Sequence, residues 1–438
     1  MRRAAAFLSI ALMAAPVSAV TKKSKKRPAA HVTRTVRSRH VSHRRSVSRA
    51  PVAQVTPVAY AAAVAYVKNE TAAAGGTLEN AAGLVPFFEQ LSHPPATGAL
   101  HVMQYGDSHT ASDDWANAMR MGLQSRFGAG GPGFALAGRP FRGYRRFDVW
   151  GESSTGWYTD GLVGRTGDGM YGLGGVSITA RSAGQTVSLK AECPELQLFY
   201  LQQPGGGQME FIVDDAPVQT ISTDGPLSPG YFKYQPTDGT HEYLLRTMSG
   251  SPVRLFGWVA ENRSGVTYET LGINGAQAGM LLDWNESIVA SQLAQHEPAL
   301  IVIAYGTNEA VSPRWTVEGY RTAFTEVVQR FRHAAPTASI LVVGPPDCEM
   351  RVGQRRAPYP HLTEVIEVQR QVAYQHGCSF WDWRARMGGP GAVDEWVNAG
   401  LSQPDRVHLT MAGYRMLGDL LISEMMEQYK RFLAVRAD

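Results

Sequence analysis

The sequence predicts an α/β protein whose parallel sheet is covered by helices on both faces, with an all-β domain inserted into it. Outside residues 145–263, apolar runs of strand length alternate with segments of helical periodicity. Inside that range the segments alternate apolar and polar residues, and short clusters of Gly, Pro, Asp and Ser separate them. This second pattern is typical of an antiparallel sandwich or jelly roll.

The N-terminus has the composition of a secretory signal peptide. Arg2 and Arg3 precede the short apolar run AAAFLSIALMAA, and VSA at 18–20 is a small-residue cleavage site. We expect residues 1–20 to be removed and the protein to be exported to the periplasm or cell envelope; an uncleaved anchor is the alternative. No later apolar run approaches the roughly 18 residues of a membrane span, so we expect no transmembrane segment in the mature chain.

Residues 21–79 are expected to form a basic, disordered tail and linker. Residues 1–50 contain 13 Lys or Arg and no Asp or Glu, and subtracting them from the chain's +4 leaves −9 for the remainder. The overall pI is therefore no argument for nucleic-acid binding, and we expect no such partner. The tail either contacts anionic envelope polymers or serves as a solvated tether.

The α/β part is expected in two segments, 80–144 and 264–438, on either side of the β insert. The first segment contains a short helix at 80–93, a buried strand at 99–105 and a helix at 110–128. In the second segment strands and helices alternate. Its strands are expected at 266–272, 299–306, 339–347 and 378–383, and its helices at 276–296, 317–336, 361–377 and 410–433.

Four short blocks of polar residues lie at or beside the ends of predicted elements. They are GDSH at 106–109, GINGAQ at 272–277, YGTNEA at 305–310 and PDRVHLT at 404–410. Ser108 lies where a strand turns into a helix, which is where open α/β sheets place their sites.

An ester hydrolase needs a nucleophile, a base, a group that orients the base, and donors for the oxyanion. Asp405 and His408 are three residues apart, so one turn of chain can bring both side chains to the same side. The carboxylate can then accept the Nδ1 proton of His408 and direct Nε2 toward Ser108. The backbone N–H groups of Ser108 and Gly275 and the side-chain amide of Asn308 are the candidate oxyanion donors.

His109 is adjacent to Ser108 but is a poor candidate for the base. Neighbouring helix residues project about 100° apart, so the two side chains do not face each other. We expect His109 to cap, pack or line the rim of the cleft. Asp107 is expected to accept hydrogen bonds from loop N–H groups, while Asp113 and Asp114 occupy the first helical turns, where negative charge suits the helix dipole.

Other polar residues give weaker signals. Asp347 either lines the cleft or sits in a turn, and Glu309 is expected to orient the Asn308 loop. Cys348 and Cys378 flank a predicted helix and could pair, which would leave Cys193 alone; the alternative is that the cysteines are unpaired and buried. We assign no metal and no cofactor, because the remaining histidines show no metal-ligand spacing. They are His101, His241, His296, His333, His361 and His376.

In combination and order, the four blocks resemble those of the SGNH (GDSL-type) hydrolases. The resemblance covers residues 86–144 and 264–438 and implies a three-layer α/β/α, flavodoxin-like domain. It assigns the catalytic roles to Ser108, Asp405 and His408, and the oxyanion hole to Ser108, Gly275 and Asn308. The alternative is a scaffold that binds but no longer reacts.

GDSHTA together with YGTNEA is most similar to exported peptidoglycan O-acetylesterases, some of which carry a carbohydrate-binding-module-like β-sandwich at this position. The resemblance implies removal of the acetyl group on the C6 hydroxyl of N-acetylmuramic acid through an acetyl-serine intermediate. The alternatives are an esterase or acyltransferase for another acylated polysaccharide, and a non-catalytic wall-binding protein. Most aromatic residues of the insert should belong to its core, although any of them could stack on sugar: Trp157, Tyr158, Tyr171, Phe199, Tyr200, Tyr231, Phe232 and Tyr234.

Overall fold

The computed structural model describes residues 55–73, 78–161 and 167–437. The α/β part is built on a five-stranded parallel sheet in the order β12-β1-β13-β14-β17. Numbered along the chain this order is 2-1-3-4-5, the doubly wound order of flavodoxin-like folds. The strands are β1 (Leu100–Gly106), β12 (Val266–Gly272), β13 (Leu300–Ala304), β14 (Ser339–Val343) and β17 (Ser379–Trp381).

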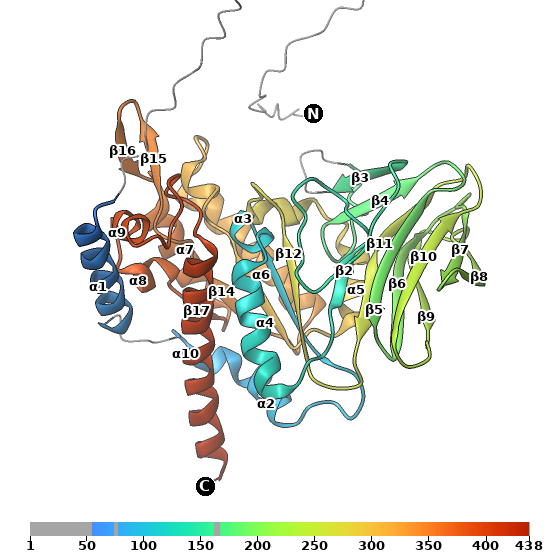
Figure 1. Cartoon of the computed structure of the whole chain (residues 1–438), viewed down its shortest axis with the longest axis horizontal. Coiled ribbons are helices and arrows are strands. Elements are labelled where there is room, and N and C mark those ends of the chain that lie inside the picture. The colour runs from blue at the N-terminus through green and yellow to red at the C-terminus, as the bar shows by residue number, and fades with distance from the viewer. Residues whose placement is uncertain (1–54, 74–77, 162–166, 438) are drawn as a thin grey trace, which may run out of the picture. The chain divides into compact units, whose positions relative to one another are not determined.

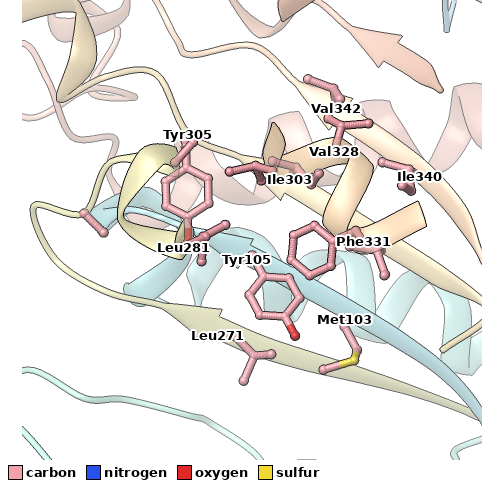
Figure 2. Close-up of a cluster of buried hydrophobic side chains, with 14 of the residues drawn as sticks. Met103, Tyr105, Leu271, Leu281, Ile303, Tyr305, Val328, Phe331, Ile340 and Val342 are labelled. Carbon is pink, nitrogen blue, oxygen red and sulfur yellow. The ribbon is translucent and has the colours of Figure 1, made fainter. Parts of the chain in front are cut away.

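Side chains of the parallel strands alternate between two buried clusters, one on each face of the sheet. In β1, Leu100 and Val102 pack with one cluster, whereas Met103 and Tyr105 pack with the other. Figure 2 shows part of the second cluster, in which Tyr105 and Ile303 lie near Phe331. Two helical layers therefore enclose the sheet, as the continuous apolar runs predict.

Helices α2, α4 and α10 contribute to the first cluster, and α5, α6 and α7 to the second (Figure 1). Shorter helical turns lie at the strand ends. The helices are α1 (Pro57–Ala73), α2 (Val85–Ser92), α3 (Ser108–Ala111), α4 (Asp114–Phe127), α5 (Glu286–His296), α6 (Val317–Ala334), α7 (Leu362–Gln375), α8 (Trp383–Met387), α9 (Ala392–Asn398) and α10 (Met411–Ala437), with 3-10 turns η1 (Ala81–Leu84), η2 (Ala278–Asp283) and η3 (Glu309–Val311).

The insert consists of two antiparallel sheets, β5-β10-β7-β8 and β3-β4-β11-β6-β9, with β2 also paired to β11. A separate buried cluster contains side chains of both sheets, including Leu189, Phe211, Leu198 and Trp258. The expected sandwich is thus present. Its strands are β2 (Gly133–Leu136), β3 (Trp157–Gly161), β4 (Val176–Ala180), β5 (Thr186–Glu192), β6 (Glu195–Gln202), β7 (Gln208–Val213), β8 (Ala216–Ser222), β9 (Ser228–Tyr234), β10 (Thr240–Thr247) and β11 (Val253–Glu261).

The expected domain boundaries at 144/145 and 263/264 remain predictions. β2, at 133–136, is the first strand to pair with the antiparallel sheets, and β11 ends at Glu261. The insert also contacts the α/β part directly, because the Tyr105 hydroxyl in β1 donates a hydrogen bond to the carbonyl of Leu173 (3.0 Å).

Residues 57–73 differ from the expected disordered linker, because they form helix α1. Its sequence contains AYAAAVAYV, and alanine is the strongest helix former. Ala63 and Val67 are buried in the same cluster as Trp396 of α9, so packing adds to this propensity. The expected signal peptide (1–20) and most of the basic tail lie outside the described residues.

Among the described residues, no helix combines the length and apolar character that a bilayer span requires. A two-stranded hairpin, β15 (Glu349–Val352) and β16 (Arg355–Pro358), follows β14 and was not expected from the sequence.

Candidate active site

Ser108 is the first residue of the short helix α3, directly after β1. The preceding Asp107 is the N-cap, and its carboxylate accepts the His109 N–H at 3.0 Å. Gly106 is required at the end of the strand, since a Cβ there would lie 2.7 Å from the carbonyl oxygen of Ala304. The close approach of β1 and β13 thus holds Ser108 at the carboxyl edge of the sheet.

The structure brings Ser108, His408 and Asp405 together. His408 Nε2 lies 2.9 Å from Ser108 Oγ, and its Nδ1 lies 2.7 Å from Asp405 Oδ2. The other carboxylate oxygen, Asp405 Oδ1, accepts the N–H groups of Val407 and His408, both at 3.0 Å. These contacts hold the carboxylate and the imidazole in the geometry that general-base catalysis by a serine triad requires.

Asp405 is ionised in this arrangement. Partial burial alone would raise its pKa, but the hydrogen bonds from the His408 ring and from the two backbone N–H groups lower the pKa below its ordinary value. A charged carboxylate can stabilise the imidazolium that forms when His408 takes a proton.

His109 is not placed as the base. It is buried, its Nδ1 lies 2.9 Å from the Tyr414 hydroxyl, and its ring meets Trp383 edge-on at 5.3 Å. Burial, with a smaller effect of His408, lowers its pKa to about 3, so the ring is neutral at physiological pH. The role that the sequence left open is therefore packing: His109 joins the Ser108 turn to α8 and α10.

Gly275 and Asn308 lie in the loops that follow β12 and β13. Gly106 of β1 is in register with Gly272 on one side and with Ala304 on the other, so the loops after all three strands are neighbours. Asn308 Nδ2 donates to the carbonyl of Ala276 (3.0 Å), which links the two loops and orients the amide. Because an amide carries two N–H donors, the second remains for an oxyanion.

Gly275 has the left-handed φ of 77°, and a Cβ added to it would meet no atom within 4 Å. The loop conformation, rather than crowding, therefore favours glycine here. The Ser108 N–H belongs to the first turn of α3, where backbone donors have no partner within the helix. The three expected oxyanion donors thus come from neighbouring loops at one sheet edge.

Two buried acids hold these loops. Glu309 accepts the N–H groups of Ala278 (2.8 Å) and Gly306 (3.1 Å), and burial raises its pKa to about 7. Burial raises the pKa of Asp107 to about 6, although the His109 N–H and the Thr307 side chain bond to it. The expected roles, Asp107 as a loop acceptor and Glu309 as the residue that orients its loop, are confirmed by these contacts.

Three further acids have structural partners. Asp113 is fully buried and has a left-handed φ of 60°; it accepts from Arg120 (2.8 Å) and from the Thr270 hydroxyl (2.6 Å). Asp114 pairs with Arg145 at 3.2 Å. Asp347 is also buried and pairs with Arg384 at 2.8 Å.

The three cysteines are buried free thiols, so Cys348 and Cys378 do not pair. One cluster brings potential metal ligands together: atoms of His101, Glu269 and His296 lie within 4.8 Å of one another. Sequence spacing gave no sign of this proximity, because the residues come from β1, β12 and α5. Hydrogen bonds already engage the imidazoles, with His296 Nε2 2.8 Å from Glu269 and His101 Nε2 2.6 Å from Glu261. The assignment of no metal stays a prediction.

Sequence reasoning missed the residues that support the site. The β15–β16 hairpin contacts the Asp405 loop, since the Glu349 N–H donates to the Arg406 carbonyl (3.1 Å) and the side chains of both residues pair. Tyr414 and Trp383 enclose His109. The hairpin had one local signal, a glycine in a two-residue turn, but its flanking residues lack the alternation that marks a strand.

Known proteins resemble this chain in part of its sequence and in its fold. Residues 237–416 match the GDSL-like Lipase/Acylhydrolase family. That range contains Gly275, Asn308, Asp405 and His408, whereas Ser108 precedes the insert and lies outside it. No curated protein matches the chain.

Among solved structures, a peptidoglycan O-acetylesterase superposes with a TM-score of 0.67 and 26% identity, over 79% of this chain and 96% of the other. A family two carbohydrate esterase from Clostridium thermocellum, bound to cellohexaose, is 13% identical over 57% of this chain and 94% of its own, with a TM-score of 0.29. One from Cellvibrio japonicus is 11% identical over 65% and 99%, with a TM-score of 0.28.

The family match, the fold and the TM-score of 0.67 agree. The chain is a carboxylic ester hydrolase that matches the GDSL-like Lipase/Acylhydrolase family over residues 237–416, and its structure is similar to that of a peptidoglycan O-acetylesterase.

Proposed function

We propose that this chain is an exported serine esterase that removes O-acetyl groups from a bacterial cell-wall glycan, most specifically the C6 O-acetyl group of N-acetylmuramic acid in peptidoglycan. One observation supports the catalytic part above all others: His408 Nε2 lies 2.9 Å from Ser108 Oγ and its Nδ1 lies 2.7 Å from Asp405.

In this proposal Ser108 Oγ attacks the acetyl carbonyl carbon while its proton passes to His408 Nε2. The N–H groups of Ser108 and Gly275 and the Asn308 amide donate to the oxyanion of the tetrahedral intermediate. As the intermediate collapses, the bond to the sugar oxygen breaks, and that oxygen takes the proton from His408. Acetyl-serine remains on the enzyme.

Water then completes the cycle. His408 removes a proton from a water molecule as its oxygen attacks the acetyl-serine carbonyl, and the same three donors hold the second oxyanion. The Ser108 oxygen leaves with the proton from His408, and acetate is released. Asp405 stays charged throughout and keeps the imidazole oriented.

The choice of substrate rests on the likeness to a peptidoglycan O-acetylesterase over 79% of the chain. The signal-like residues 1–20 support export, and the basic residues that follow suit an anionic envelope. An acyltransferase is less favoured, because the related polysaccharide acetyltransferases tend to carry their Asp-x-His pair before the serine. Here His408 follows Ser108 by 300 residues.

We also propose that the insert binds glycan. A groove of about 550 Å³ lies against it, and its lining includes Trp150, Arg145 and Lys190. Trp150 is 64% exposed, and an exposed indole can stack on a sugar ring. Of the aromatic residues considered from the sequence, Tyr171, Phe199 and Tyr200 are buried, and only Tyr158 is widely exposed (68%).

The test compares acetate release from O-acetylated peptidoglycan and from acetylated xylan, for the wild type and Ser108→Ala. We expect the wild type to prefer peptidoglycan and Ser108→Ala to lose acetate release while it still binds the glycan. A wild type without preference would remove the substrate assignment and leave the esterase. Faster transfer of acetyl to a sugar than to water would instead identify a transferase.

A further inference from the structure

The hairpin formed by β15 and β16 carries three arginines at its outer end. We call residues 349–358 the arginine hairpin; it projects at the upper left of Figure 1. Arg351, Arg355 and Arg356 are all exposed, and none of them forms an ion pair with any residue in the described part of the chain. This local excess of positive charge contrasts with the −9 of the chain after its basic N-terminal region.

Strand register places two of these charges side by side. Arg351 is directly opposite Arg356, whereas Arg355 is opposite Val352. Directly opposed residues project from the same face of a hairpin, so Arg351 and Arg356 share one face and Arg355 belongs to the other. Like charges in directly opposed positions destabilise a strand pair. A bound anion would relieve this repulsion.

The Arg356 side chain reaches the catalytic loop, whereas Arg351 Nε donates to the carbonyl of Gly353 in the hairpin turn (3.0 Å). The Arg356 guanidinium donates to the carbonyl of Pro404 (3.2 Å) and to that of Asp405 (3.5 Å). At the base of the hairpin, the Tyr359 N–H donates to the Cys348 carbonyl (3.2 Å) and closes the loop.

The same segment is also attached to the oxyanion side. The N–H of His361, just after the hairpin, donates to the carbonyl of Ala310 (3.1 Å), two residues beyond Asn308. Backbone hydrogen bonds therefore join the arginine hairpin to both the Asp405–His408 loop and the Asn308 loop. This attachment holds the arginine hairpin beside the two loops that carry Asp405, His408 and Asn308.

We propose that Arg351 and Arg356 form a binding site for a carboxylate of the polymer, close to the ester that Ser108 attacks. Guanidinium groups bind carboxylates with two parallel N–H donors, so two adjacent arginines suit an acidic glycan. The site selects acetylated polymers that carry carboxylates over uncharged ones. For peptidoglycan as the natural polymer, this inference rests on the proposed function.

The test uses Arg351→Gln, with Arg355→Gln as the matched control on the opposite face of the same hairpin. Arg356 is left intact because it touches the catalytic loop. For each full-length protein, kcat/KM is measured on O-acetylated peptidoglycan, on acetylated pectin, which is a second carboxylate polymer, and on acetylated xylan free of uronic acid. The basic residues 1–50 are the same in all variants, so differences report on the hairpin.

We expect Arg351→Gln to reduce kcat/KM on the two carboxylate polymers by about five-fold relative to xylan, because exposed charge pairs contribute modestly. The difference should shrink at high salt, which screens such contacts. Arg355→Gln should leave the ratio at its wild-type value. Thermal unfolding of Arg351→Gln should be at or above the wild-type temperature, since a like-charge pair is removed.

The proposal is overturned if both variants change the ratio equally, or if activity on xylan falls as much as activity on the charged polymers. Failure of the proposed function would give a different result from failure of the arginine site. The wild type would then show no preference for peptidoglycan, while the effect of Arg351→Gln on pectin relative to xylan would remain.

Discussion

His109 Nδ1 lies 2.9 Å from the hydroxyl of Tyr414, although 305 residues separate them in the sequence. This contact and the edge-on packing against Trp383 hold the His109 side chain in the protein interior, although His109 is adjacent to Ser108. The histidine that lies within hydrogen-bonding distance of Ser108 Oγ comes instead from the far end of the chain.

Replacing Tyr414 tests whether His109 has a packing role and leaves the catalytic role to His408. Tyr414→Phe removes the partner of a buried imidazole nitrogen, so we expect a loss of about 1–3 kcal/mol in the free energy of unfolding. Hydrolysis of an aryl acetate should stay within about ten-fold of the wild type, because the general base is untouched. Denaturant unfolding and kcat give the two values. Activity as low as that of His408→Ala in a folded Tyr414→Phe protein would contradict the packing role.

Asp405→Asn tests the orientation of the base. The amide cannot supply the negative charge that the carboxylate offers to His408, so we expect kcat to fall by about 10⁴-fold, as in other serine triads. The loss should persist at every pH at which the protein is folded. Asp419→Asn, on the exposed face of α10, is the control and should retain full activity. A variant of Asp405 with near-wild-type kcat would remove this residue from the mechanism.

Asn308→Ala removes the side-chain oxyanion donor. A donor that acts on the transition state lowers kcat more than it changes KM, and we expect a loss of about 10²–10³ in kcat. Steady-state kinetics on an aryl acetate separate the two parameters. If KM rises while kcat holds, Asn308 binds the ground state and is no oxyanion donor.

Glu309 gives a prediction for pH. Its pKa is raised from 4.5 to about 7 in the folded protein, so the folded state holds a proton that the unfolded state releases. The associated stability is present below pH 4.5 and is lost as pH rises to about 7. We expect the stability difference between the wild type and Glu309→Gln to move in favour of the variant over this interval.

Denaturant unfolding at several pH values measures that difference. Glu286→Gln, an exposed carboxylate in the first turn of α5, is the control and should show no such trend. A pH-independent difference for Glu309→Gln would show that Glu309 titrates alike in both states.

The α/β architecture and the assembly of the site could be predicted from local patterns. Ser108 and Asn308 each follow an apolar run, and the carboxyl ends of parallel strands lie at one edge of a sheet. The two residues therefore lie close together regardless of the β domain inserted between them in the sequence. The pairing of Asp405 with His408 could be predicted because the two residues are three positions apart in the sequence. The β insert could be recognised for a similar reason, since its alternation of apolar and polar residues is a local property.

What the sequence did not show depends on packing between distant segments. The environment of His109 is set by α10, and helix α1 is ordered because Ala63 and Val67 find a buried surface. The stacking of His101 on His296, at 4.0 Å between ring centroids, likewise joins β1 to α5. The opposition of Arg351 and Arg356 becomes visible only once the strand register is known.

The most direct test of the central claim is to trap the acyl-enzyme. The wild type is mixed with an O-acetylated substrate, quenched in acid during turnover, digested, and its peptides are analysed by mass spectrometry. We predict one added acetyl group on Ser108 within GDSH, and none in Ser108→Ala, which should also release no acetate. Acetate release by folded Ser108→Ala, or an acetyl group on another residue in its place, would contradict the assignment of Ser108 as the nucleophile.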